Sequence, residues 1–216
     1  MCSIMHKLKF FSMKQLYGVT IFLLIISTFA CKRDNKPTIT MIDVKKLPLR
    51  GEKGFNAIVE VPAGTNRKLE IQPDGQFVAE QVEGKARVVN FLPYPGNYGF
   101  IPSTLMDEAR GGDGDALDVI IIAETVAVGT VQEFIPIAVL KMIDEGENDT
   151  KIIGIPADPA LRVIRATNFE QFLLEYDAAK RIIETWFVHY QGYGTVQVLG
   201  WEDEKSALAE IEKWAL

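Results

Sequence analysis

The chain has 216 residues, of which 48% are hydrophobic and 24% are charged, and its formal net charge is -6. This composition is typical of one globular domain and unlike that of a disordered or fibrous protein. The acidic balance argues against nucleic acid as a partner, because binding to a phosphate backbone needs clustered Lys and Arg. An acidic protein can still bind a small polyanion if metal ions bridge the two.

The first 31 residues have the order of a secretory signal. Lys7, Lys9 and Lys14 precede an apolar run over residues 16–30, which is shorter than the typical membrane span of about 20 residues. The run ends in STFAC, which resembles a bacterial lipoprotein cleavage site. We therefore predict a signal peptide over residues 1–30, then a lipidated Cys31 that begins a polar tether over residues 31–53. An uncleaved anchor helix is the alternative.

The next hundred residues read mainly as strands. FNAIVEVPA (55–63), KLEIQ (68–72) and QFVAEQV (76–82) are short and end at turns, and ARVVNFL (86–92) leads into PYPGNYGFIP (93–102), which reads as a Pro/Gly-rich loop. ALDVIIIAE (116–124) and EFIPIAVLKMID (133–144) are longer apolar runs that are typical of buried strands. Several short strands in so few residues predict a small closed barrel.

The hydrophobic period then changes to that of a helix. Apolar residues recur at helical spacing over residues 167–190, and Thr167 and Glu170 have the spacing of a capping box. TVQVLGW (195–201) predicts one more strand, and residues 202–216 predict a short final helix. The expected fold is α+β and mainly β: a small closed OB-like barrel with a long helix and a short C-terminal helix packed outside it.

Three carboxylates crowd the entry to one predicted strand. Asp113, Asp115 and Asp118 follow a Gly-Gly turn in GGDGDALDVIII, residues 111–122. Carboxylates this close repel one another, and a bound divalent cation is the arrangement that holds them together at the lowest free-energy cost. An EF-hand loop starting at Asp113 fails, because Leu117 stands where a ligand is needed and Asp118 stands where Gly is needed. A solvated acidic turn is the alternative reading of the triplet alone.

Other strand ends carry a similar mixture of acids, cations and phenols. These segments are EVPAGTNRKLE (60–70), PYPGNYG (93–99) and KMIDEGENDTK (141–151), with Arg87 just before the second. Such a mixture suits a polyanionic substrate that is bridged by several magnesium ions.

Taken together, these segments resemble the soluble, magnesium-dependent, barrel-type inorganic pyrophosphatases. The family signature is Asp-x-Asp-x-x-Asp followed by apolar residues, and DGDALDV (113–119) fits it. The resemblance covers roughly residues 54–215, and several motifs occur in the family's order. It implies a pyrophosphatase domain over residues 54–216 that hydrolyses diphosphate to two phosphates with a metal-activated water.

The resemblance also implies a role for each acidic residue. Asp115 would be the general base beside the attacking water. Asp113, Asp118 and Asp149 would hold the tight magnesium, Asp144 and Asp149 a further one, and Glu60 and Glu70 would bind another ion or order water. Mg²⁺ is the expected cofactor, with several ions in the site, and the sequence leaves open whether Mn²⁺ or Zn²⁺ can replace it.

Phosphate oxygens would be held by the cations and phenols of the same segments, with Tyr94 lining the site. The resemblance assigns this role to Lys68, Arg87, Tyr98, Lys151, Tyr190 and Gln191. The last residue departs from the family pattern, in which a Lys follows the Tyr. A neutral amide donates a hydrogen bond without a charge, and charge-assisted hydrogen bonds are roughly twice as strong. We therefore expect weaker phosphate binding than in relatives that carry the Lys.

Two readings of function and location stay open at this point. The leading one is a diphosphatase exported and anchored in the membrane as a lipoprotein, facing the periplasm or the outside. The alternative function is a weakly catalytic or non-catalytic lipoprotein that binds metal or phosphate on the same barrel. The alternative location is the cytoplasm, which is usual for the family. Relatives are often homo-oligomers, but the sequence leaves the oligomeric state of this chain open.

Overall fold

The structure is a computed structural model, and it describes residues 47–216 except residues 73, 145 and 193. The described residues all lie in one compact unit, Ile39–Leu216. Within them, no helix is both long enough and apolar enough to span a membrane. The predicted signal peptide and Cys31 lie outside the described residues.

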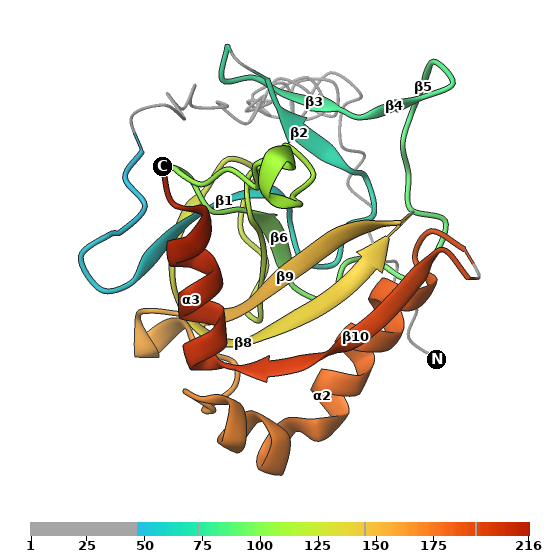
Figure 1. The fold of residues 1–216 in the computed structure, drawn as a ribbon. Coiled ribbons are helices and arrows are strands. Elements are labelled where there is room, and N and C mark those ends of the chain that lie inside the picture. The colour runs from blue at the N-terminus through green and yellow to red at the C-terminus, as the bar shows by residue number, and fades with distance from the viewer. Residues whose placement is uncertain (1–46, 73, 145, 193) are drawn as a thin grey trace, which may run out of the picture. The chain divides into compact units, whose positions relative to one another are not determined.

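Five strands close into a ring. In spatial order they are β1 (Phe55–Val61), β6 (Asn97–Phe100), β7 (Asp118–Ile121), β9 (Glu147–Pro156) and β8 (Val131–Asp144), and β8 pairs with β1 to close the circle. β7 and β9 run parallel, whereas the other neighbours in the ring are antiparallel. β10 (Val196–Asp203) extends the sheet on the free part of β8. The predicted OB-like barrel is confirmed (Figure 1).

Alternation along the strands builds two hydrophobic clusters. In β7, Val119 and Ile121 belong to a cluster with Trp214, whereas Ile120 belongs to a cluster with Phe172 and further residues of the long helix. Successive side chains of a strand point to opposite faces, so both faces of β7 are buried. This arrangement explains why the sequence of β7 is continuously apolar after Asp118.

Two helices cover the sheet from outside (Figure 1). α2 (Phe169–His189) follows the short 3-10 helix η4 (Pro159–Leu161), and α3 (Glu204–Trp214) packs against β8 near the chain end. Both predicted helices are confirmed, but the predicted capping box is displaced. Asn168 is the N-cap of α2 and its side chain accepts a hydrogen bond from the backbone N of Gln171, because Asn is as good a cap as Thr.

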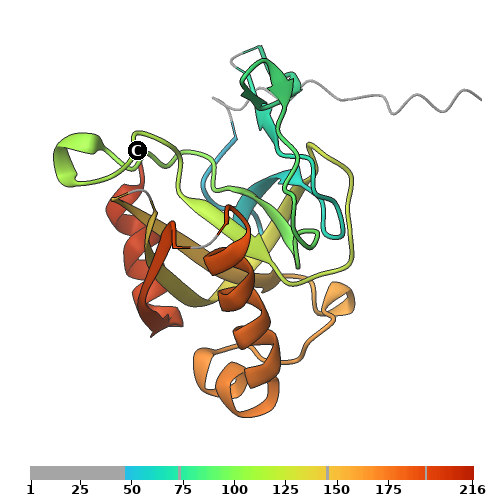
Figure 2. The ribbon, with the colours of Figure 1, turned by 90° about the vertical axis from the view of Figure 1, so that its right-hand side faces the viewer.

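A narrow arm of two hairpins projects from the barrel (Figures 1 and 2). Its strands are β2 (Leu69–Ile71), β3 (Phe77–Ala79), β4 (Gln81–Val82) and β5 (Lys85–Ala86). The single strand predicted over residues 76–82 is therefore wrong: it is interrupted at Glu80, where β3 stops pairing with β2 and β4 begins to pair with β5. Residues 88–92 lie outside the named strands, and Val88 makes an isolated bridge with Arg67.

The Pro/Gly-rich segment also differs from the prediction of a loop, because β6 begins inside it at Asn97. Gly99 makes this strand able to pair with β1. A Cβ at Gly99 would lie 1.8 Å from the carbonyl oxygen of Ile58, so any other residue would push the two strands apart.

Candidate active site

Lys151 is the centre of the acidic cluster. The parallel pairing of β7 and β9 sets Asp118 beside Lys151, and Asp149 precedes Lys151 by two residues on the same face of β9. The Lys151 side chain is buried, and its Nζ donates to both carboxylates. It also lies 3.2 Å from the Tyr98 Oη, which donates to Asp118 Oδ2 at 2.5 Å. Residues of three strands therefore meet at one ammonium group.

The charges of this cluster depend on one another. Burial by itself would lower the pKa of Lys151, but the adjacent Asp118 and Asp149 carboxylates raise it well above its ordinary value. Burial raises the pKa of Asp149, and the Lys151 ammonium opposes that effect. Burial also raises the pKa of Tyr98, with Asp118 adding to it, so Tyr98 remains a hydrogen-bond donor at neutral pH.

The loop before β7 presents Asp113 and Asp115. It follows the short 3-10 helix η3 (Glu108–Arg110), and Asp113 accepts a hydrogen bond from the backbone N of Asp115 at 2.9 Å. Gly114 between them has a φ of +86°, a conformation that favours glycine. Partial burial raises the pKa of Asp115, and the Asp113 and Asp118 carboxylates raise it further. Asp115 is thus a stronger base than an isolated aspartate.

The chain end and β9 hold this loop in place. The backbone N of Leu105 donates to the carbonyl of Trp214 at 2.9 Å, and Arg110 Nη2 donates to the carbonyl of Lys213 at 2.8 Å. From the other side, Asn148 Nδ2 donates to the carbonyl of Gly111 at 3.1 Å. The aspartate loop is therefore fixed at both ends, although its residues before Leu117 are only half-buried or exposed.

Glu60 and Glu70 approach the same region from β1 and β2. Glu60 is buried, and its Oε1 accepts a hydrogen bond from the backbone N of Ile71 at 3.0 Å. Burial raises the pKa of Glu60 to about 8, and the charge of Asp118 adds to this shift. Glu70 is more exposed and pairs with Lys68, at 3.3 Å between Oε1 and Nζ.

Lys68 and Arg87 come from the base of the arm, where each forms an ion pair with Glu80. Lys68 Nζ lies 3.0 Å from Glu80 Oε2, and Arg87 Nη1 lies 2.9 Å from Glu80 Oε1. The side chains of both cations are only about one quarter exposed, at 25% and 24%. The structure thus brings the two predicted phosphate-binding cations together through Glu80, a residue that no sequence motif singles out.

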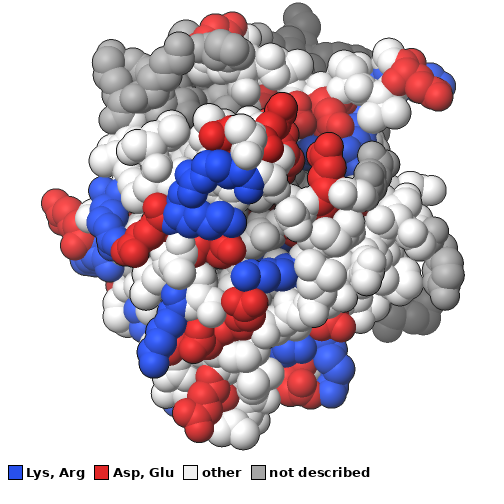
Figure 3. Space-filling view, in the orientation of Figure 1, with Lys and Arg blue, Asp and Glu red and all other residues white. Residues whose placement is uncertain are grey.

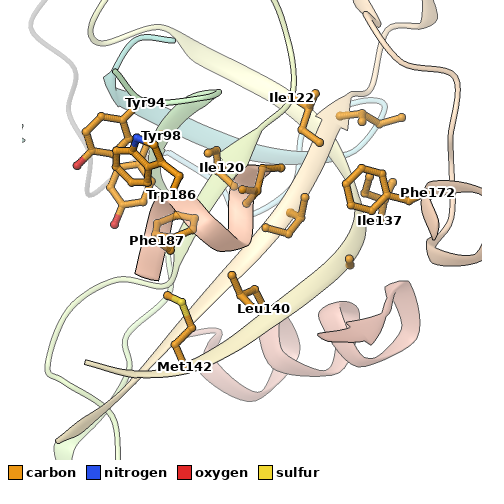
Figure 4. Packing of buried hydrophobic residues seen from close by; sticks show 14 of the residues in the cluster. Tyr94, Tyr98, Ile120, Ile122, Ile137, Leu140, Met142, Phe172, Trp186 and Phe187 are labelled. Atoms are coloured by element: carbon orange, nitrogen blue, oxygen red, sulfur yellow. The ribbon is translucent and has the colours of Figure 1, made fainter. Parts of the chain in front are cut away.

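An aromatic wall closes the site on the side of α2. The Trp186 ring stacks on Tyr190 with 4.8 Å between ring centroids. Its centroid lies 4.3 Å from that of Tyr94, which in turn lies 5.2 Å from that of Tyr98, and Figure 4 shows Tyr94, Tyr98 and Trp186 together. Trp186 Nε1 donates to the carbonyl of Leu92 at 2.8 Å. Trp186 therefore fixes two of the three tyrosines. From the sequence pattern, Trp186 could be recognised only as one of the apolar residues at helical spacing.

The end of β8 and the end of α2 meet at Gln191. Gln191 Nε2 donates to Asp144 Oδ2 at 2.5 Å and to Tyr190 Oη at 2.6 Å. Tyr190 is the C-cap of α2, so the helix end sets the position of both residues. The neutral amide bridges a phenol and a carboxylate, a role that the sequence did not reveal.

The predicted site residues thus gather at one end of the barrel. Figure 3 shows acidic side chains collected on the face seen in Figure 1, with Lys and Arg next to them. Within the described residues, however, no three Asp, Glu, His or Cys side chains are arranged so that they could hold a metal ion directly. Instead, the ammonium of Lys151 stands between Asp118 and Asp149.

Comparisons with known proteins identify the family. Residues 57–216 match the family model described as inorganic pyrophosphatase. The inorganic pyrophosphatase of Neisseria meningitidis is 34% identical over 172 residues, which cover 74% of this chain and 88% of that protein.

Solved structures give the same result. The crystal structure of the inorganic pyrophosphatase from Thermus thermophilus matches with a TM-score of 0.66 at 30% identity, covering 79% of this chain and 95% of that one. A truncated vacuolar soluble pyrophosphatase of Trypanosoma cruzi, solved in complex with PPi, matches with a TM-score of 0.68 at 25% identity, covering 80% and 74%. The chain belongs to the inorganic pyrophosphatase family.

Proposed function

We propose that the acidic end of the barrel is the site at which this chain hydrolyses diphosphate to two phosphates. The observation that carries the proposal is the buried Lys151 between Asp118 and Asp149, joined there by Tyr98. A structural salt bridge needs one carboxylate, whereas a site for a metal-neutralised polyanion needs several carboxylates next to cations. Membership of the pyrophosphatase family gives the reaction.

The donor set fits divalent cations, and Mg²⁺ in particular. Every proposed ligand is a carboxylate, and hard oxygen donors are what Mg²⁺ prefers; Mn²⁺ and Zn²⁺ are the proposed substitutes. The Lys151 ammonium is a stand-in cation between two of these ligands. We assign the ions to Asp113, Asp118, Asp144 and Asp149, with Glu60 and Glu70 as further ligands. When bound, such ions lower the pKa of a coordinated water and neutralise phosphate charge.

Asp115 is the proposed general base. Its loop is anchored on both sides, yet its own side chain is exposed at the mouth of the site. The raised pKa of Asp115, caused by partial burial and by the charges of Asp113 and Asp118, suits a group that must take a proton from water and release it afterwards.

The remaining polar groups position the phosphates. Arg87 presents a planar guanidinium that can bind two phosphate oxygens, and Lys68 adds a second charge beside it. Tyr98 and Tyr190 offer hydroxyl donors held by the aromatic wall. Lys151 would donate to a phosphate oxygen, and Asp118 and Asp149, which now accept from it, would be among the carboxylates that hold the metal ions.

The first prediction concerns the general base. The purified protein will release phosphate from diphosphate with Mg²⁺, and release will stop with a chelator. Asp115→Asn will lower kcat by about 10²–10⁴-fold, because positioned proton transfer contributes that much. Phosphate release followed by a colorimetric assay measures both effects. Glu108→Gln, which removes a carboxylate from the preceding exposed turn, is the matched control and will leave kcat unchanged. Undiminished kcat in Asp115→Asn would remove Asp115 from this role.

The second prediction concerns the neutral amide at the end of α2. Gln191→Lys will place an ammonium beside Tyr190 and Asp144 and will tighten phosphate binding, with KM for diphosphate about two- to tenfold lower, because a charged donor binds an anion more strongly. Gln197→Lys adds the same charge on an exposed position of β10 and serves as the control. Equal KM values for all three proteins would contradict the expectation.

We also propose that the chain is exported and anchored through a lipidated Cys31, with diphosphate hydrolysed at the membrane surface. The order of charges, apolar run and STFAC in the first 31 residues supports this location. Several acyl chains give stable anchoring, since each buried methylene adds about 0.8 kcal/mol.

The third prediction tests the anchor. In a bacterium that processes lipoproteins, the protein will carry palmitate label and sediment with membranes, and Cys31→Ala will abolish the label. Cys2→Ala is the matched control, because residue 2 lies in the part that is removed, and its label will persist. An unlabelled, full-length protein in the soluble fraction would instead support the cytoplasmic location.

A further inference from the structure

Glu80 occupies a position that the proposed reaction does not use. It lies in the break between β3 and β4, and its carboxylate pairs with two cations: Arg87 Nη1 donates to both oxygens, and Lys68 lies beside Oε2. Oε1 accepts from Arg87 Nη1 at 2.9 Å, and Oε2 lies 3.0 Å from Lys68 Nζ. The Glu80 side chain is 21% exposed, so these pairs are partly screened from water.

The main chain fixes this arrangement. The backbone N of Lys68 donates to the carbonyl of Arg87 at 3.3 Å, the backbone N of Glu80 to the carbonyl of Lys68 at 3.1 Å, and the backbone N of Arg87 to the carbonyl of Glu80 at 2.7 Å. The three residues are therefore joined pairwise by backbone hydrogen bonds. These bonds fix the backbone of Glu80 beside the two cations. Its side chain can still rotate without changing the base of the arm.

The carboxylate of Glu80 has the features of a phosphate group in this position. It is an anion whose two oxygens bridge a guanidinium and an ammonium, which is how Arg and Lys together bind phosphate. Burial alone would raise the pKa of Glu80, but the hydrogen bonds from Arg87 and Lys68 lower it, so Glu80 is charged at neutral pH. A phosphate that approaches Lys68 and Arg87 meets cations that are already paired.

We propose that Glu80 is a positioning residue that holds Lys68 and Arg87 ready for phosphate and competes with phosphate for them. Glu80 thereby sets the affinity of the site for phosphate groups. The inference rests on the proposed function in that Lys68 and Arg87 are taken to bind the substrate. The two parts of the proposal act on phosphate affinity in opposite directions. Competition predicts that removing the charge strengthens binding, and positioning predicts that removing the acceptor oxygens as well weakens it again.

Two variants separate these parts. Glu80→Gln keeps the length of the side chain and one acceptor oxygen but removes the competing charge. It will bind methylenediphosphonate, a diphosphate analogue that is not hydrolysed, about two- to fivefold more tightly, since a partly exposed ion pair contributes up to roughly 1 kcal/mol. Glu80→Ala removes the acceptors as well, so Lys68 and Arg87 lose their alignment and the analogue will bind less tightly than it does to Glu80→Gln.

Isothermal titration calorimetry with a fixed Mg²⁺ concentration measures these affinities, and thermal unfolding shows that both variants fold. Glu83→Gln is the matched control: it removes the same charge from the exposed β4–β5 turn and will leave binding unchanged. Unchanged or weaker binding by Glu80→Gln would overturn the competition. Equal binding by Glu80→Gln and Glu80→Ala would overturn the positioning.

The kinetics distinguish this inference from the proposed function. Glu80→Gln will lower KM for diphosphate with kcat changed less than KM, because Glu80 touches the phosphate-binding cations and not Asp115. If the parent protein does not hydrolyse diphosphate, the proposed function fails, whereas the order of analogue affinities still tests Glu80. If the parent is active and the order of affinities is reversed, only the inference about Glu80 fails.

Discussion

The site depends on the buried Lys151, whose positive charge balances the closely spaced carboxylates of Asp118 and Asp149. Burying an ion costs several kcal/mol of folding free energy unless opposite charges and hydrogen bonds replace the water around it. Removing one partner of a buried ion pair typically destabilises a protein by about 3–5 kcal/mol. Lys151 has two carboxylates and a tyrosine hydroxyl around its ammonium. The same carboxylates would hold the metal ions of the proposed reaction, and Lys151 would then be available to a phosphate oxygen.

The barrel delivers these groups through its strand pairing. The parallel pairing of β7 with β9 sets Asp118 opposite Lys151, while the antiparallel pairing of β6 with β7 brings Tyr98 to the same end. Gly99 allows β1 to approach β6, and β1 carries Glu60. The exposed aspartate loop is the least regular part, and contacts to the chain end and to Asn148 replace the strand pairing it lacks. Rigid strands thus hold the ammonium and its partners, while an anchored loop presents the base.

Local patterns in the sequence were sufficient for most of the fold. The apolar runs located β1, β7 and β8, and helical spacing located α2 and α3. The order of the acidic motifs indicated the family. Pairing between distant segments leaves no local pattern, so neither the β7–β9 contact nor the break of the strand at Glu80 could be read from the chain. Trp186 and Gln191 were ambiguous for the same reason: their roles depend on Leu92 and Asp144, which are far away in sequence.

The central claim is that divalent cations take the place that the Lys151 ammonium holds between Asp118 and Asp149. Diffraction from crystals soaked in Mn²⁺, recorded at the manganese absorption edge, tests it most directly. The account predicts anomalous peaks within about 2.0–2.4 Å of carboxylate oxygens of Asp113, Asp118 and Asp149, with the Lys151 ammonium no longer between them. Lys151 still bridging Asp118 and Asp149, with no peak at these carboxylates at saturating Mn²⁺, would contradict it.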